Sequence, residues 1–269
     1  MNVLEALLLG LVQGVTEFFP VSSSGHLVLA EELLGVTTEN IRFMVVIHLG
    51  SLLAVLAVYR GQVGRIVKGL FRGRVRYRRG RWTFSDPYTR LGWLLLLGTI
   101  PAGIVGILTG RLIANFFSSP FLVGVCLTVT GLVLFCVRLI RPREGEPNWW
   151  RTIIVGVAQA VAILPGMSRS GLTITAGIYS GIEKSRAAEF SFLLSIPVIL
   201  CAGALEVGRM IKVGFCLSEV LPLLAASGAA AISGYLAIRF LLRIIKKGRL
   251  HYFAYYCWLV ALIVFILYI

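Results

Sequence analysis

Apolar stretches of about twenty residues recur along this chain, separated by short polar or basic intervals. A helix of that length spans the hydrocarbon core of a bilayer, because its backbone polar groups are satisfied within the helix. Hydrophobic residues make up 58% of the 269 residues and charged residues only 14%, too little polar surface for a soluble domain. The pattern predicts an all-α polytopic membrane protein and lacks the alternating strands of a transmembrane β-barrel. The expected spans are 43–59, 91–110, 121–140, 189–208, 218–238 and 250–269.

The net charge of +14 comes from basic residues whose placement predicts which loops are cytoplasmic. They concentrate between apolar segments, in the intervals 60–81, 138–151 and 239–249. Cytoplasmic loops carry such an excess of Lys and Arg. This distribution argues against nucleic acid as a partner. We interpret the arginine-rich interval 60–82 mainly as a topological signal, with binding of anionic lipid headgroups as the alternative.

Two regions, 1–36 and 152–182, each contain an apolar stretch, a break rich in Gly, Pro and Ser, and a second apolar stretch. If both are re-entrant hairpins, every basic loop lies in the cytoplasm, both termini lie outside, and the hairpins enter from opposite faces. The alternative is two ordinary hairpins that span the bilayer fully. Segments 3–17 and 26–36 are short for full spans, which favours the re-entrant interpretation.

The two halves of the chain are expected to have inverted topology. Each half contains one re-entrant helical hairpin and three transmembrane helices, related by a pseudo-two-fold axis in the membrane plane. We therefore expect a single membrane domain, 1–269, made of a first inverted repeat at 1–141 and a second at 152–269. Such repeats form sites near the bilayer midplane from broken helices.

One polar run occurs twice without a gap, as GLVQGVTEFFPVSSSG at 10–25 and as GVAQAVAILPGMSRSG at 156–171. The copies differ in their chemistry. The first carries a carboxylate, Glu17, and a hydroxyl, Ser23, where the second carries an isoleucine and the guanidinium of Arg169. A duplicated frame with complementary charges in its two halves predicts one composite site.

Both copies place serine and glycine where a helix is expected to begin. Pro20 disfavours helix at the preceding Phe19, so the first helix should end there. The N-terminus of the following helix offers free N–H groups and positive dipole, which suit a phosphate. The serines have helix capping as their alternative role. The expected substrate-binding residues are Gln13, Ser22, Ser24, Gly25, Gly166, Ser168, Ser170 and Thr173.

A hydrolytic set forms if the two hairpin tips meet. Ser23 would attack phosphorus while Glu17 or His26 removes its proton, and Arg169 would hold a diphosphate with two donors. A carboxylate in an apolar segment is costly unless it faces a cavity, a cation or Arg169. The alternatives are an interhelical hydrogen bond for Glu17 and a polar helix start for His26. His48 is interpreted as cavity lining.

These motifs resemble those of the integral-membrane undecaprenyl-diphosphatases of the bacitracin-resistance type. The family's first motif is Glu or Gln, three residues and Glu, followed by Pro-Val-Ser-Ser and Gly-His; it is matched from Gln13 to His26. Its second motif, Pro-Gly-x-Ser-Arg-Ser-Gly with a threonine two residues beyond, is matched from Pro165 to Thr173. The run EFSFLLSIP at 189–197 is also similar, and the resemblance covers essentially the whole chain.

The resemblance implies hydrolysis of a polyprenyl diphosphate to its monophosphate, which recycles the lipid carrier of cell-wall sugars. It implies Ser23 as nucleophile, Glu17 as its activator, Arg169 as diphosphate ligand and His26 as an assisting group. The site is then open to the extracytoplasmic face of the plasma membrane. A divalent cation, Mg²⁺ or Ca²⁺, is also implied, with Glu17 and substrate phosphates as ligands. Because position 13 is Gln, one motif carboxylate remains, and cation binding should be weak before substrate arrives.

Other functions fit parts of the pattern. A secondary transporter or lipid flippase is the main alternative, since inverted repeats with broken helices are typical of transporters. An ion channel is disfavoured, because no filter-like repeat is present. The expected partners are the polyprenyl diphosphate and membrane lipids, and a homodimer is considered as a further assembly. The five cysteines lack metal-site spacing and are interpreted as small apolar residues.

Overall fold

The computed structural model describes residues 1–36, 41–78, 81–114, 120–141, 143–213 and 217–268. These residues form helices and one small antiparallel hairpin, β1 (Val75–Arg78) and β2 (Arg81–Phe84). A short 3₁₀ turn, Val137–Leu139, follows α6. The α-helices are α1 (Val3–Phe18), α2 (Ser23–Leu34), α3 (Ile41–Val58), α4 (Arg60–Arg72), α5 (Pro87–Ala114), α6 (Pro120–Cys136), α7 (Trp149–Val161), α8 (Arg169–Tyr179), α9 (Lys184–Val213), α10 (Leu217–Lys246) and α11 (Tyr252–Tyr268).

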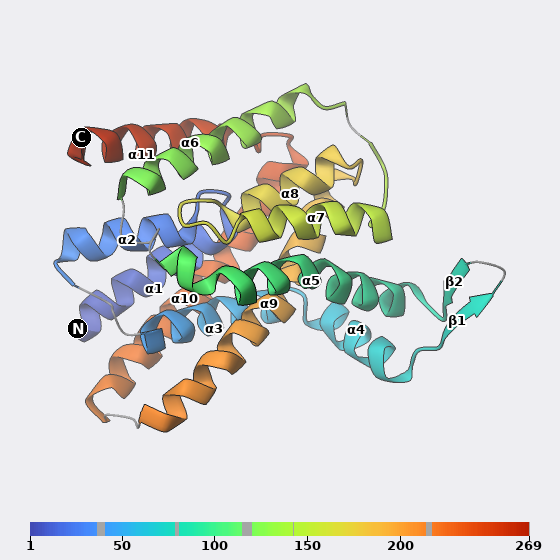
Figure 1. Cartoon of the computed structure of the whole chain (residues 1–269), viewed down its shortest axis with the longest axis horizontal. Helices are drawn as coiled ribbons and strands as arrows, with labels where there is room; N and C mark the ends of the chain where they lie inside the picture. Colours follow the sequence, from blue (N-terminus) through green and yellow to red (C-terminus); the bar gives the residue numbers. More distant parts are fainter. Residues whose placement is uncertain (37–40, 79–80, 115–119, 142, 214–216, 269) are drawn as a thin grey trace.

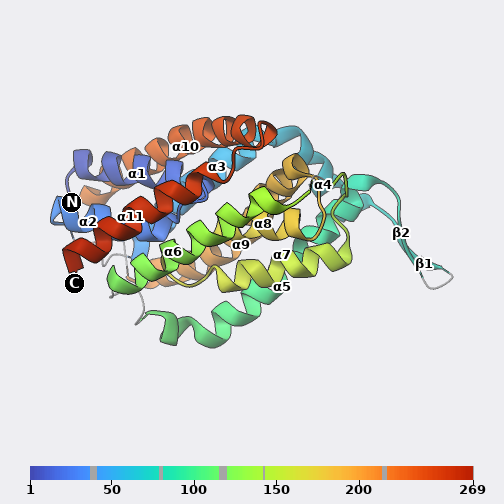
Figure 2. The ribbon, with the colours of Figure 1, turned by 90° about the horizontal axis from the view of Figure 1, so that it is seen from above.

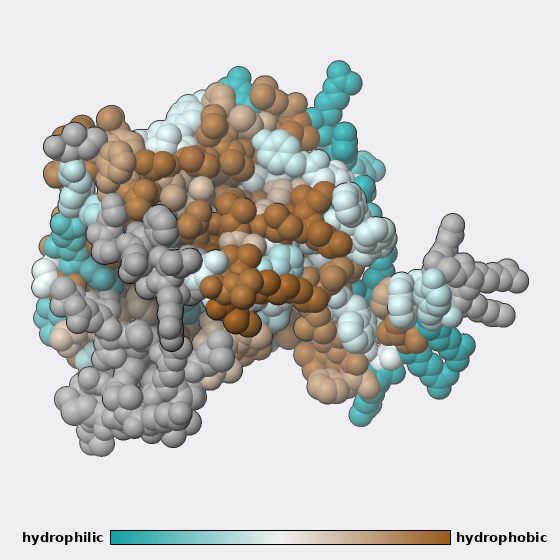
Figure 3. Space-filling view, viewed as in Figure 1, coloured by the Kyte–Doolittle hydropathy of each residue, from teal (hydrophilic) through white to brown (hydrophobic). Residues whose placement is uncertain are grey.

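Four helices, α5, α6, α9 and α10, are long and apolar enough to cross a membrane. The bent pair α3–α4 would add a fifth span, and α11 is apolar but shorter. This confirms the all-α polytopic class and the four predicted spans that lie in α5, α6, α9 and α10. Large apolar side chains on the outer face of α5 are exposed, among them Ile104 and Ile107. Figure 3 shows an apolar surface across the middle of one face and hydrophilic residues at the end that carries the β-hairpin.

The arginine-rich interval is more structured than the loop that the sequence predicted. The chain turns by 92° between α3 and α4. Helix α4 buries Ile66 and Gly69 and leaves its basic residues exposed. Asp86 caps the start of α5, accepting hydrogen bonds from the backbone N–H groups of Tyr88 and Thr89. The Thr89 hydroxyl also donates a hydrogen bond to Asp86. This bond has the largest effect, and together with the backbone bonds it lowers the pKa of Asp86 from 3.8 to about 2.

The two predicted hairpins are present as helix pairs with broken tips. Helix α1 ends at Phe18, and Phe19 is extended, with φ −64° and ψ 141°, because Pro20 disfavours helix before it. Both chain termini lie at one end of the molecule and the β-hairpin at the other (Figure 1). The α1–α2 hairpin begins at the end with the termini, and α7–α8 begins at the opposite end (Figure 1). Their tips meet inside the helix bundle.

Packing between helices fixes the positions of these tips. Helix α1 packs along α10, and α7 packs along α5. Helices α3 and α9 contact each other between these pairs, while α11 lies beside α6 (Figure 2). The core beneath the tips contains Phe18 and Phe192, whose rings meet edge to face with centroids 5.7 Å apart.

Candidate active site

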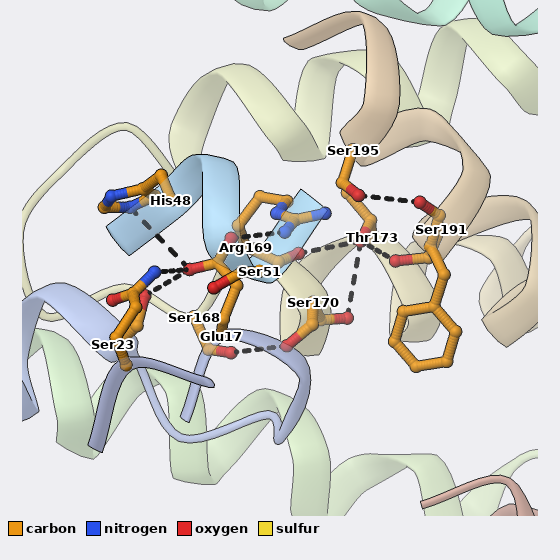
Figure 4. A network of polar contacts seen from close by, with 12 residues as sticks. Glu17, Ser23, His48, Ser51, Ser168, Arg169, Ser170, Thr173, Ser191 and Ser195 are labelled. Carbon is orange, nitrogen blue, oxygen red and sulfur yellow. Dashed lines mark hydrogen bonds and ion pairs between the residues drawn. The ribbon is translucent and has the colours of Figure 1, made fainter. Parts of the chain in front are cut away.

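Glu17, in the last turn of α1, is the centre of a cluster built from four helices (Figure 4). Its Oε2 accepts hydrogen bonds from Ser23 Oγ at 2.7 Å and from Gln13 Nε2 at 3.0 Å. Its Oε1 accepts from Arg169 Nη2 at 2.6 Å. His48 Nε2 lies 3.8 Å from Oε2. The carboxylate is 8% exposed, so an ion pair and hydrogen bonds replace the water it has lost.

Backbone and hydroxyl contacts hold the two hairpin tips together. Ser170 Oγ donates to the Phe19 carbonyl at 3.0 Å, and the Gly166 N–H donates to Ser24 Oγ at 3.4 Å. Gly166 has φ 86°, and a Cβ there would lie 2.8 Å from the Val123 carbonyl oxygen. The convergence of the tips that the repeat predicted is therefore present, and it is what brings Arg169 to Glu17.

The first residue of each serine motif caps a helix, which was the alternative role for these residues. Ser22 Oγ accepts from the Gly25 N–H at 3.3 Å, and Ser168 Oγ accepts from the Gly171 N–H at 3.0 Å. Ser22 does so with φ 69°, a value that residues other than glycine rarely adopt. Capping leaves Ser23 in the first turn of α2 with its hydroxyl directed at Glu17.

Several predicted substrate-binding residues are buried in a layer behind the cluster. Ser168, Ser170 and Thr173 are at most 1% exposed. Thr173 Oγ1 lies 2.6 Å from Ser191 Oγ and 2.7 Å from the Arg169 carbonyl, to which it donates. Figure 4 shows this layer continuing from Arg169 towards α9. These hydroxyls therefore fix the backbone of α8, whereas Ser24 is partly exposed at the tip.

His26 lies outside the Glu17 cluster, although the sequence placed it among the catalytic residues. Its Nδ1 is 2.9 Å from the Ser22 carbonyl oxygen, and its Nε2 is 2.9 Å from Tyr256 Oη. The carbonyl can only accept, so Nδ1 is the donor and Nε2 accepts from the Tyr256 hydroxyl. The rings of His26 and Tyr256 also stack, with centroids 5.6 Å apart.

The structure adds His48 to the site. Its Nδ1 lies 2.7 Å from the Met44 carbonyl oxygen one turn earlier in α3 and donates to it, which leaves Nε2 facing Glu17. The sequence carried a signal for this residue, because a histidine inside an apolar span is expected to face a cavity or a partner. The sequence did not identify Glu17 as the partner of His48, because α3 and α1 become neighbours only in the folded structure.

Two buried polar atoms of the cluster have no hydrogen-bond partner among the described residues: Gln13 Oε1 and Arg169 Nη1. The first is an acceptor of the kind that hard cations bind, and the second is a donor suited to a phosphate oxygen. The described residues contain no group of three or more His, Cys, Asp or Glu arranged for a metal ion. Gln13 and Glu17 therefore fit a divalent cation only together with oxygens that a substrate supplies.

Comparisons with known proteins identify close relatives. The profile of a family described as "Bacitracin resistance protein BacA" matches residues 6–263. An undecaprenyl-diphosphatase of Halothermothrix orenii is 42% identical over 270 residues, 99% of this chain and 98% of the relative. That of Methanobrevibacter smithii is 42% identical over 273 residues, 98% of this chain and 97% of the relative. Undecaprenyl-diphosphatase 1 of Shouchella clausii is 41% identical over 275 residues, 99% of this chain and 96% of the relative.

Proposed function

The chain belongs to the BacA family of bacitracin resistance proteins, and we propose that it hydrolyses undecaprenyl diphosphate to undecaprenyl monophosphate and inorganic phosphate. This reaction returns the lipid carrier to cell-wall synthesis, and the family description links it to bacitracin resistance. The observation that carries the proposal is the unbroken contact from Ser23 through Glu17 to Arg169, which joins a nucleophile, a base and a phosphate ligand.

Ser23 is the proposed nucleophile. Its Oγ attacks the terminal phosphorus while Glu17, 2.7 Å away, accepts the hydroxyl proton. A bond forms between Oγ and phosphorus, the bond from that phosphorus to the bridging oxygen breaks, and undecaprenyl monophosphate leaves. Water then attacks the phosphoserine, the bond between Oγ and phosphorus breaks, Glu17 returns its proton to Ser23, and both protons of the water leave with the phosphate. Inorganic phosphate is released.

Arg169 is the proposed diphosphate ligand. Before substrate binds, its Nη2 is paired with Glu17, while its Nη1 is a buried donor that has no partner among the residues the structure describes. A diphosphate carries more charge than one carboxylate and accepts two parallel N–H bonds, so the guanidinium is expected to transfer part of its pairing to the substrate. That transfer weakens the hold on Glu17 and makes its carboxylate a better base. The N-terminus of α2 faces the same anion.

A divalent cation is part of the proposal, with Mg²⁺ and Ca²⁺ as the candidates. Glu17 and the unpaired Oε1 of Gln13 are the residues that would hold it. When bound, the ion would neutralise charge on the diphosphate. The residues of the chain would still align the Ser23 hydroxyl and exclude bulk water, since Glu17 is buried.

We further propose that 1–141 and 152–269 are inverted repeats and that the site opens to the extracytoplasmic face. Equivalent pairs of helices pack together, since α1 lies on α10 and α7 lies on α5. The helix and strands of the basic interval 60–82 lie at the end opposite to both termini (Figure 1). The positive-inside rule assigns this basic end to the cytoplasm. Both termini are then outside. A homodimer stays a prediction.

The test is phosphate release by the purified protein from long-chain polyprenyl diphosphate in detergent, with Mg²⁺ or Ca²⁺ added. The matching polyprenyl monophosphate is the control substrate, and we expect no phosphate from it, because it lacks the anhydride bond. Equal release from both substrates would replace the proposal with a general lipid phosphatase. No release from either, by protein that is folded, would remove the enzymatic function.

A further inference from the structure

A groove of about 730 Å³ lies beside the α1–α2 tip, and its lining includes none of the residues that contact Glu17. It is bounded by α1, the end of α10 and the start of α11. Its floor includes Phe19, at the break of the hairpin, and its wall includes Tyr256, which holds His26. The volume is in the range of sites for small ligands, and most of the lining is apolar.

The wall from α10 has a mixed character set by helical spacing. Arg243 and Ile244 lie three and four residues after Phe240, and Lys247 lies three or four residues after them, so all four share one face of the helix end. Phe240 is 52% exposed on this face. The result is an apolar surface that becomes basic towards the end of the helix, which matches a molecule with an apolar tail and an anionic head.

A left-handed turn adds a third cation to the rim. Gly248 has φ 69°, and the N–H of Arg249 bonds to the Ile244 carbonyl at 3.1 Å, which closes the end of α10. This turn reverses the chain, so that Arg249 lines the groove together with Arg243 and Lys247.

In the described part of the chain, these three cations have no carboxylate partner. Among the described residues they make no ion pair and no side-chain hydrogen bond, and the sequence contains no Asp or Glu after Glu219. By contrast, Arg186 contacts Glu146 and Glu183. Arg243, Lys247 and Arg249 are exposed, so their charges are accessible to an anion beside the apolar groove, and the basic end of a membrane protein meets anionic headgroups.

We propose that this groove binds an anionic phospholipid from the leaflet at the basic end of the molecule. Its phosphate contacts Arg243, Lys247 and Arg249, and its acyl chains lie along Phe240 and Phe253. The lipid is distinct from the diphosphate substrate, whose phosphates belong to the Glu17 cluster, because the groove is lined by none of the residues of that cluster. The exposed side of α10 gives it lateral access from the bilayer.

The test is native mass spectrometry of the purified full chain in detergent, titrated with phosphatidylglycerol. Phosphatidylcholine with the same acyl chains and inorganic phosphate are the two comparison ligands. We expect one tight phosphatidylglycerol site, weaker phosphatidylcholine binding and no competition by inorganic phosphate at millimolar concentration. Equal affinity for both lipids would overturn the charge argument, and full competition by phosphate would make the groove a phosphate site.

Two variants separate the groove from general surface charge. The triple variant Arg243→Gln, Lys247→Gln and Arg249→Gln should weaken phosphatidylglycerol binding at least about tenfold. Ile244→Trp should produce a similar loss by filling the groove at unchanged charge, and it decides the question if the triple variant fails to fold. The matched control removes three exposed cations of α4, at Arg60, Lys68 and Arg72. An equal loss in this control would refute the proposal.

Discussion

The Ser23 hydroxyl donates a 2.7 Å hydrogen bond to the Glu17 carboxylate across the break that Pro20 introduces. The two residues are six apart in sequence, a spacing that would not place them together on one continuous helix. The contact exists because α1 stops at Phe18 and α2 begins at Ser23 with a reversed direction. The break in the helix is therefore what brings together the proposed nucleophile, Ser23, and its proposed base, Glu17.

Ser23→Ala is expected to lower kcat at least about a thousandfold, because the substitution removes the attacking atom. Phosphate release from polyprenyl diphosphate measures the effect. Ser51→Ala is the matched control: Ser51 is buried near the cluster, but its hydroxyl donates to the Ile47 carbonyl of its own helix. It should keep activity within a few fold. If Ser23→Ala were close to wild type, attack by water activated by Glu17 would replace the covalent mechanism.

Arg169→Ala is expected to destabilise the protein by about 3 kcal/mol, because it leaves the buried charge of Glu17 without its partner. Thermal unfolding in detergent measures this loss. The cycle is completed by Glu17→Gln alone and by the double variant Glu17→Gln, Arg169→Ala. The double variant removes both charges and should recover much of the stability lost in Arg169→Ala, while activity stays absent. Additive losses in the double variant would show that the ion pair does not couple the two hairpins.

Gln13→Glu is expected to lower the Mg²⁺ concentration needed for half-maximal activity, because a second carboxylate joins Glu17 at the proposed cation site. Titration of activity with Mg²⁺ at saturating substrate measures the shift. Gln159→Glu is the control that the repeat supplies: Gln159 occupies the equivalent position in α7, where its amide donates to the Gly98 carbonyl. This control should leave the Mg²⁺ dependence unchanged. Equal shifts in both variants would place the cation elsewhere.

Asp86 is expected to cap α5 over the whole physiological pH range. Its pKa falls from 3.8 to about 2 in the folded protein, because Thr89 and the helix N–H groups bond to the ionised form. The capping contribution is therefore fully present above pH 3.8 and is lost as the pH falls through about 2. Hydrogen-exchange protection of the Thr89 amide, corrected for intrinsic rates, should stay constant from pH 8 to pH 4. Asp86→Ala should reduce that protection throughout; unchanged protection would contradict the cap.

The proposed topology predicts one-sided labelling of the β-hairpin. Tyr77 is 62% exposed in β1, and a cysteine there should react with a membrane-impermeant maleimide only in inverted vesicles. The five native cysteines are first replaced by alanine or serine. A cysteine at Leu4, near the exposed N-terminus, is the matched position and should react only from the outside. Reaction of Tyr77→Cys in intact cells would reverse the orientation.

Much of the fold could be predicted because single residues set its breaks. Pro20 ends α1 where the sequence requires, and the serine motifs begin α2 and α8. Helix α4 was missed, since its dense arginines resembled a loop. Its apolar residues, Ile66 and Leu70, are nevertheless four apart and form one face. The apolar residues of α4 therefore have helical spacing in the sequence, but the many basic residues around them led to the prediction of a loop.

The site was predictable where partners belong to the duplicated motif and less so elsewhere. Ser23 and Arg169 occupy equivalent positions, so their convergence on Glu17 followed from the repeat. His48 and Tyr256 belong to other helices, and their contacts depend on tertiary packing that periodicity does not specify. The pairing of His26 with Tyr256 therefore had no signal in the sequence.

The break at Phe19 and Pro20 also bears on how the protein is made. Among the described residues, the Pro20 carbonyl accepts from Cys257 Sγ of the second half of the chain, whereas the Phe19 carbonyl accepts from the Val21 N–H as well as from Ser170 Oγ. Lipid offers no donors to such groups. An N-terminal half emerging alone from the translocon would leave the Pro20 carbonyl without this donor until the second half inserts. Quality-control proteases would thus meet an unfinished tip only while synthesis is incomplete, and the last helix to emerge would end that exposure.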